Sequence, residues 1–67
     1  MVDAGACLRA AQANRKITNL KLAEDFGVSK QQVHRWRFAT DMRISRMQTF
    51  ADYFGVGLHD YIDLGKQ

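Results

Sequence analysis

The sequence predicts an all-α fold, a compact bundle of about five short helices forming one domain over residues 1–67. Apolar residues recur at helical spacing in successive segments of the chain. Residues suited to cap helix N-termini precede several of these segments, and glycines follow where the apolar spacing stops. A chain of 67 residues lies near the lower limit at which a core alone can hold a fold. We therefore expect no second domain.

The first helix is expected from Asp3 to Ala13. Asp3 can cap its first turn, and one buried stripe follows at i, i+3, i+4 and i+7. The stripe consists of Ala4, Cys7, Leu8 and Ala11. Residues 14–16 are predicted to form a polar bend, whose positive charge suits a helix C-terminus.

Two helices are expected to meet at a tight corner between Asn19 and Phe38. The first of them begins near Asn19 after the cap residue Thr18, and it ends at Gly27, where a left-handed backbone conformation suits glycine. Its apolar residues are Leu22, Ala23 and Phe26, and Val28 lies under the corner. The small side chain of Ala23 lets the two helices approach closely.

The second helix of the corner begins after Ser29, a good cap, and turns Val33 and Trp36 inward. At about 100° per residue, the opposite side carries Gln31 and Arg35. His34 lies beside them, with Lys30 and Gln32 on the flanks. This face is basic and rich in amides, and glutamine and arginine can each bond two edge atoms of a base in the major groove. An ordinary solvated helix face remains the alternative.

Two further helices complete the expected bundle. The segment 38–41 is predicted to be a loop in which Thr40 and Asp41 cap the next helix. The fourth helix ends at Gly55 and buries a stripe formed by Ile44, Met47, Phe50, Ala51 and Phe54. The fifth covers Leu58–Leu64, ends at Gly65, and places Leu58, Tyr61 and Ile62 on one side.

The corner resembles the helix-turn-helix of the phage-repressor type, the family of lambda-like Cro and CI proteins and the XRE regulators. The residues that match in type and spacing are Leu22, Ala23, Gly27, Val28, Val33 and Trp36. The resemblance extends more weakly over most of the chain, and it implies a lambda-repressor-like DNA-binding fold. The expected partner is double-stranded DNA, bound through the major groove.

The resemblance also implies roles for individual residues. Its base-reading positions fall on Lys30, Gln31 and Arg35, with Gln32 a lesser candidate, and helical geometry selects Gln31 and Arg35 independently. By helical geometry, His34 would flank this surface.

Phosphate contacts are expected from the rim of the same surface. The start of the helix at Asn19 matches the family's clamp on the DNA backbone, since helix N-termini favour anions. The family's usual glutamine is replaced there by Asn19, and its partner glutamine by Lys30, which can reach the phosphate itself. Arg37, Thr40 and Arg43 are the other phosphate candidates by position.

Helix-turn-helix proteins usually bind DNA as two-fold dimers whose recognition helices lie about 34 Å apart. The resemblance implies a homodimer through the C-terminal region, with Tyr61, Ile62 and Leu64 at the interface. In the alternative, these three residues only close the core.

Composition agrees with a DNA-binding role and argues against other classes. Ten Lys and Arg outnumber seven Asp and Glu, which gives a net charge of +3 and favours polyanionic partners. Cys7 is the single cysteine, so no internal disulfide can form and a reducing, cytoplasmic location is expected. No apolar run approaches the ~20 residues of a membrane span.

An enzyme is not expected, because the sequence contains no glycine-rich phosphate loop and no nucleophile turn. No cofactor or metal is expected, and no small-molecule effector is evident. His59 and Asp63 have i, i+4 spacing without further ligands, so we expect a surface pair.

The favoured function is a dimeric Cro-like repressor of a phage or prophage that occupies a palindromic operator. Two alternatives remain open. One is a restriction-modification controller or antitoxin-type regulator of the same fold, and the other is a helix-turn-helix adaptor that binds protein.

Overall fold

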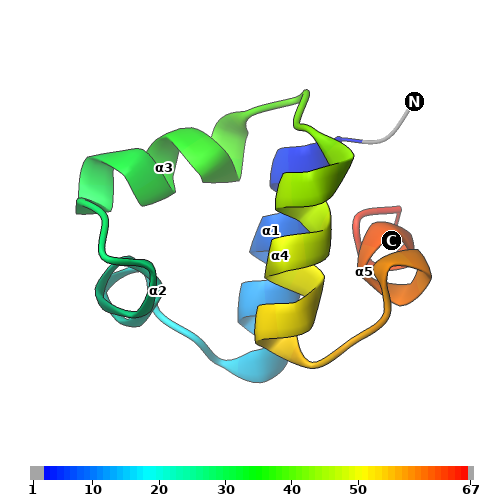
Figure 1. Ribbon diagram of the computed structural model, residues 1–67, viewed down its shortest axis with the longest axis horizontal. Helices are drawn as coiled ribbons and strands as arrows, with labels where there is room; N and C mark the ends of the chain where they lie inside the picture. Colours follow the sequence, from blue (N-terminus) through cyan, green and yellow to red (C-terminus); the bar gives the residue numbers. More distant parts are fainter. Residues whose placement is uncertain (1–2, 67) are drawn as a thin grey trace.

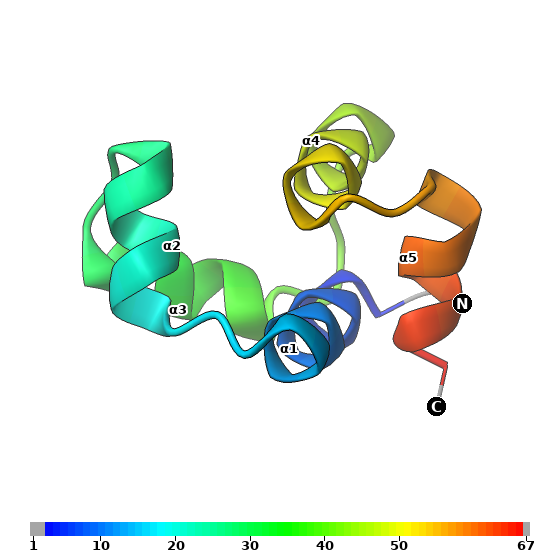
Figure 2. The same cartoon turned by 90° about the horizontal axis from the view of Figure 1, so that it is seen from below.

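The computed structural model describes residues 3–66, which form five helices and no strand. The helices are α1 (Ala4–Arg15), α2 (Asn19–Phe26), α3 (Lys30–Phe38), α4 (Ile44–Phe54) and α5 (Leu58–Leu64). Helices α1 and α4 lie at the centre, with α2 and α3 on one side and α5 on the other (Figure 1, Figure 2). Helix α1 contacts α3, α4 and α5, and α2 contacts α3. The predicted all-α fold class is confirmed.

Local capping sets most of the helix ends. The side chains of Asp3, Thr18 and Ser29 each accept a hydrogen bond at 3.0–3.1 Å from the amide three residues later. Such bonds satisfy amides that the first helical turn leaves without a partner. Gly27 and Gly55 end α2 and α4 with φ angles of 67° and 74°, a conformation that glycine adopts without steric cost. These predicted caps and stops are confirmed.

One hydrophobic core joins all five helices. The largest fully buried side chains are Tyr61, Phe50, Leu8, Leu22, Val33 and Cys7. The stripe predicted for the first helix is buried throughout, with at most 2% of any of its residues exposed. Burial raises the pKa of the Cys7 thiol, so this cysteine behaves as a small apolar residue.

An aromatic cluster joins α2, α3 and α4. The ring centroid of Trp36 lies 5.7 Å from that of Phe26 and 5.2 Å from that of Phe50, both edge-on. Beside them, the Tyr53 hydroxyl donates a hydrogen bond to Asp25. Burial and this carboxylate raise the pKa of Tyr53 to about 12, while the Tyr53 hydroxyl lowers the pKa of Asp25. The aromatic cluster and the hydrogen bond between Tyr53 and Asp25 together fix α2 against α4.

The prediction of a polar bend at residues 14–16 is wrong, because α1 continues to Arg15. Lys16 alone makes the turn, with a left-handed φ of 56°. The amide of Ile17 then bonds to the Gln12 carbonyl at 2.9 Å. A single left-handed residue lets the following amides satisfy the last carbonyls of the helix, so no longer bend is needed.

The expected start of α4 is also corrected. Thr40 and Asp41 do not cap it, since its N-cap is Arg43, which makes no side-chain capping bond. Instead, the Thr40 carbonyl accepts a bond from the Ala4 amide at 3.4 Å, and the chain reaches α4 only later. Ile44 was expected inside but is 61% exposed, because it lies in the first turn at the edge of the stripe. Met42 packs against the core nearby.

In the C-terminal helix, Tyr61 is 0% exposed. It stacks on Phe54 with the centroids 6.3 Å apart, so it closes the core of its own chain and has no surface to offer a second copy. Its placement at a dimer interface is therefore wrong. Ile62 and Leu64 are only half-buried.

Candidate functional site

Helix α3 is held against the core by one side. Val33 is 0% exposed and Trp36 is 8% exposed. At the corner, Ala23 and Leu22 of α2 are buried, and the Val28 amide bonds to the Ala23 carbonyl at 3.0 Å. This packing fixes the rotation of α3 about its own axis, so its opposite side must face solvent.

The outward side of α3 carries the residues expected from helical geometry. Lys30, Gln31, His34 and Arg35 are all exposed, whereas Gln32 is half-buried. We call the four exposed residues, together with Phe38, the α3 outer surface. The prediction that Gln31 and Arg35 lie on the side of α3 opposite Val33 and Trp36 is thus confirmed.

Phe38 belongs to this surface, although its role was not anticipated from the sequence. It ends α3 instead of opening the following loop, and it is 59% exposed. Gln31 lies seven residues earlier and therefore on the same side of the helix. The rings of His34 and Phe38 are 4.8 Å apart, and the Arg9 guanidinium lies 5.1 Å from the Phe38 ring centre. An arginine from α1 thus borders the surface.

Helix α1 holds the C-terminal end of α3. The Gly5 amide donates to the Ala39 carbonyl at 2.7 Å, and the Arg9 guanidinium donates to the Arg37 carbonyl. A Cβ on Gly5 would lie 2.4 Å from the Arg37 oxygen, so the approach of the two backbones requires glycine. The first turn of α1 therefore sets the position of α3.

A buried polar network lies behind the phosphate candidates. Gln12 of α1 is 3% exposed. Its Oε1 accepts a hydrogen bond from Arg37 at 2.5 Å, and its Nε2 donates to the Ile17 carbonyl at 3.2 Å and to Asn19 Oδ1 at 2.9 Å. Arg37, half-buried, is thus engaged within the chain, whereas Asn19 is exposed at the start of α2. Gln12 was not anticipated from the sequence.

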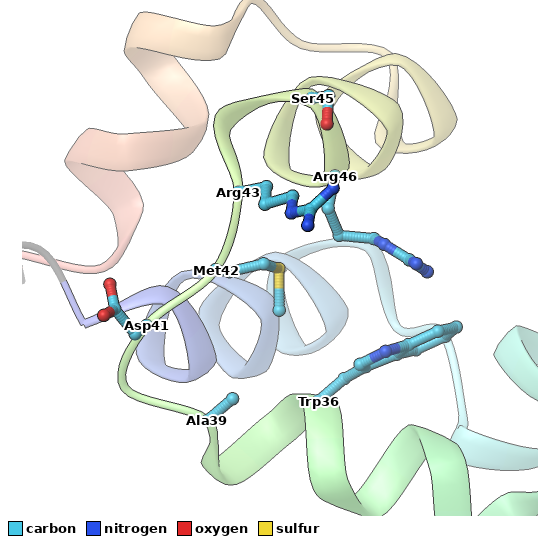
Figure 3. Close-up of a pocket in the computed structure, with 7 residues that line it drawn as sticks. All are labelled: Trp36, Ala39, Asp41, Met42, Arg43, Ser45 and Arg46. Atoms are coloured by element: carbon cyan, nitrogen blue, oxygen red, sulfur yellow. The ribbon is translucent and has the colours of Figure 1, made fainter.

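A basic hollow lies between the end of α3 and the start of α4 (Figure 3). Its lining comprises Trp36, Ala39, Asp41, Met42, Arg43, Ser45 and Arg46. The Arg46 guanidinium lies 5.0 Å from the centre of the Trp36 ring. The Asp41 side chain points away from that ring in Figure 3. Arg43, Ser45 and Arg46 are exposed, and the last two were not anticipated as site residues.

Charge is distributed unevenly along the chain. Residues 30–46 contain five cations and one carboxylate, which are Lys30, Arg35, Arg37, Arg43 and Arg46 against Asp41. Residues 52–66 contain three carboxylates and one cation, Asp52, Asp60 and Asp63 against Lys66. Half of the ten Lys and Arg residues thus lie between the start of α3 and the first turn of α4, away from α5 (Figure 1). A polyanion would be attracted to that end.

Other kinds of site receive little support from residues 3–66. No group of three or more His, Cys, Asp or Glu in this part of the chain could hold a metal ion. His59 and Asp63 form the expected pair, with Nε2 and Oδ2 3.3 Å apart and both side chains well exposed. None of the described helices is long and apolar enough to cross a membrane.

The comparisons with known proteins agree with this geometry. A family model described as the Cro/C1-type HTH DNA-binding domain matches residues 8–67. No curated protein and no solved structure matches the chain. The matched region includes the corner, the α3 outer surface and the basic hollow. The chain therefore belongs to the Cro/C1-type helix-turn-helix family of DNA-binding regulatory domains.

Proposed function

We propose that the chain is a sequence-specific transcriptional regulator, a dimeric Cro-like repressor of a phage or prophage that binds a palindromic operator through the major groove. The observation that carries this proposal is the exposure of Gln31 and Arg35 on a helix whose opposite side is anchored by Val33 and Trp36. An α-helix fits the major groove, and these two side chain types can bond base edges there.

Base reading is assigned to Gln31 and Arg35, assisted by Lys30 and the half-buried Gln32. Arginine suits the two acceptors of guanine, and glutamine suits adenine. His34 flanks them. Phe38 extends the same surface, and its exposed ring is suited to contact the methyl group of thymine.

Contacts to phosphate are assigned to the rim. Asn19 lies at the start of α2, where backbone amides attract an anion. Thr40 and Arg43 lie beyond the end of α3, and Arg46 adds a cation beside the Trp36 ring. Arg37, which bonds to Gln12, contributes mainly its charge. These contacts would orient the domain on DNA without reading its sequence.

The dimer is proposed to use the half-buried Ile62 and Leu64 of α5. This helix lies on the far side of the molecule from α2 (Figure 2), so contact through it would leave both copies of α3 free. Two copies related by a two-fold axis would place their recognition helices in successive major grooves.

Selection of bound sites from random DNA duplexes tests the proposal. We expect a two-fold symmetric motif whose half-sites are about 10 base pairs apart. We also expect an affinity that falls steeply with salt. A protein-binding adaptor would show no such salt dependence of DNA affinity. Selected duplexes that share no common sequence motif would refute specific recognition.

Arg35→Ala is expected to relax specificity at one base pair in each half-site. The loss corresponds to about 1–3 kcal/mol of discrimination. The fold should be retained, because Arg35 is exposed. Affinities for the selected site and its single-base variants provide the measurement. Lys66→Ala on the opposite side of the molecule should leave discrimination unchanged, and unchanged discrimination in Arg35→Ala would refute the assignment.

Arg43→Gln is expected to weaken binding to all sequences alike. Losing one phosphate contact per copy should make the slope of log affinity against log salt shallower by about 0.9 per copy. Titrations at several salt concentrations measure this slope. Lys66→Gln removes the same charge next to α5 and should not change it, so equal slopes in Arg43→Gln and the unmodified protein would argue against the contact.

A further inference from the structure

Gln12 is a buried amide on the side of α1 that faces the core, and it is 3% exposed. It connects residues that are far apart in sequence, Arg37 at the end of α3 and Asn19 at the start of α2. Gln12 is too deeply buried to contact DNA. Its influence on binding must therefore act through the residues that it holds.

The orientation of the Gln12 amide follows from the chemistry of its partners. A guanidinium group only donates hydrogen bonds, so the group facing Arg37 must be the oxygen, Oε1. The Ile17 carbonyl only accepts, so the group facing it must be the nitrogen, Nε2. The hydrogen bonds at both ends of the amide therefore require the same orientation. Neither partner can exchange its role as donor or acceptor, so the oxygen and the nitrogen of the Gln12 amide can be told apart.

That orientation determines how Asn19 is turned. The remaining proton of Gln12 Nε2 points at the Asn19 side chain over a distance of 2.9 Å, and only the Asn19 oxygen can accept it. Asn19 Oδ1 is therefore directed inward, which leaves its Nδ2 group to face solvent as a donor.

The exposed Nδ2 lies beside other donors. The Thr18 side chain caps α2 by accepting a hydrogen bond from the backbone amide of Lys21. Within residues 3–66, no hydrogen bond occupies the backbone amides of Asn19 or Leu20. Phosphate oxygens only accept hydrogen bonds, so a donor from Asn19 next to these amides matches a phosphate, whereas a reversed Asn19 would present an oxygen and repel it.

We infer that Gln12 is a positioning residue for DNA binding: anchored by Arg37, it turns the Asn19 amide so that Nδ2 donates to a backbone phosphate. This inference rests on the proposed function. It also couples the end of the recognition helix to the phosphate contact at α2 through a single side chain.

The unmodified protein provides the first test, by NMR of the side-chain amides with and without the duplex obtained by selection. The Gln12 amide protons should exchange slowly with solvent in both states. Those of Asn19 should exchange rapidly in the free protein and slowly in the complex. Asn19 protons that remain unprotected in the complex, or Gln12 protons that exchange rapidly in the free protein, would overturn the inference without any substitution.

Gln12→Glu provides the second test, because glutamate still accepts from Arg37 but cannot donate to Asn19. Each phosphate of the selected duplex is replaced in turn by an uncharged methylphosphonate. In the unmodified protein, one replacement per half-site next to α2 should reduce affinity about tenfold, the effect of a hydrogen bond to a charged group. Gln12→Glu and Asn19→Ala should both lose this sensitivity, while sensitivity at other phosphates is retained.

Gln48→Glu on α4 is the matched control, since it makes the same change of charge elsewhere and should retain the sensitivity. Undiminished sensitivity in folded Gln12→Glu would overturn the inference, even though DNA binding itself remained intact. Absence of any salt-dependent duplex binding by the unmodified protein would instead refute the proposed function. If Gln12→Glu does not fold, the amide exchange experiment decides the question alone.

Discussion

Gly5→Ala is expected to destabilise the domain by about 1–3 kcal/mol, the usual cost of overpacking a close contact. The added Cβ would lie 2.4 Å from the Arg37 oxygen and 2.7 Å from the Ala39 oxygen. Both are backbone atoms, which cannot rotate away as a flexible side chain would. The first turn of α1 must therefore separate from the end of α3, which breaks the 2.7 Å hydrogen bond between the Gly5 amide and Ala39.

The effect opposes intrinsic helix propensity, which makes the prediction specific. In an exposed helix, alanine would be more favourable than glycine by up to about 1 kcal/mol. A destabilised Gly5→Ala variant would show that packing against α3 outweighs this gain. Since a domain of this length is expected to be stable by only roughly 3–10 kcal/mol, the loss would be a large fraction of the total.

Urea unfolding followed by circular dichroism and by the fluorescence of the single tryptophan measures this change. Gly57→Ala is the control, because its added Cβ would meet nothing within 4 Å and its φ is an ordinary −72°. The control should change stability by less than about 1 kcal/mol, as expected for a helix N-cap. A Gly5→Ala variant as stable as the control would mean that α1 does not constrain α3. If Gly5→Ala is destabilised as expected, its affinity for DNA should also fall, because α3 would be displaced.

Most of the fold could be predicted because its signals are local. The cap residues Thr18 and Ser29 act on amides three residues away, and the left-handed Gly27 lies directly at the end of α2. The inward side of α3 follows from the spacing of Val33 and Trp36 alone. Its outward side, which carries the candidate base-reading residues, follows by helical geometry.

The contacts that position α3 could not be predicted, since they join segments far apart in the chain. Gly5 packs against the backbone of Arg37 and Ala39, and Gln12 accepts a hydrogen bond from Arg37. Two signals were nevertheless present in the sequence. A glycine within an alanine-rich helix suggests a close backbone approach, and Gln12 continues the buried stripe of α1 as a polar residue, which must then find partners inside.

Periodicity also cannot distinguish a surface that meets the core from one that meets a second copy. Tyr61 and Ile62 are neighbours on the same helix, yet only Tyr61 is completely buried. The difference arises from the position of Phe54 on α4, which stacks on the Tyr61 ring. Such tertiary contact is not encoded in the spacing of residues along α5.

Trp36→Ala is expected to have the largest effect on stability, about 3–5 kcal/mol, as for other large aromatic residues removed from a core. The ring is packed between Phe26 of α2 and Phe50 of α4, and the Arg46 guanidinium covers it. Its removal would leave a cavity where the three helices meet. Since the loss is a large fraction of the roughly 3–10 kcal/mol expected for the domain, thermal unfolding by circular dichroism should show a strongly lowered midpoint.

Leu20→Ala is the control, because it shortens an apolar side chain that is 51% exposed and should change stability by less than about 0.5 kcal/mol. Trp36→Phe, which keeps a ring in the cluster, should fold and bind DNA more weakly than the unmodified protein. If Trp36→Ala were as stable as Leu20→Ala, the inner side of α3 would not be anchored by this contact. The outward orientation of Gln31 and Arg35 would then lose its physical cause, and with it the main argument for reading DNA through α3.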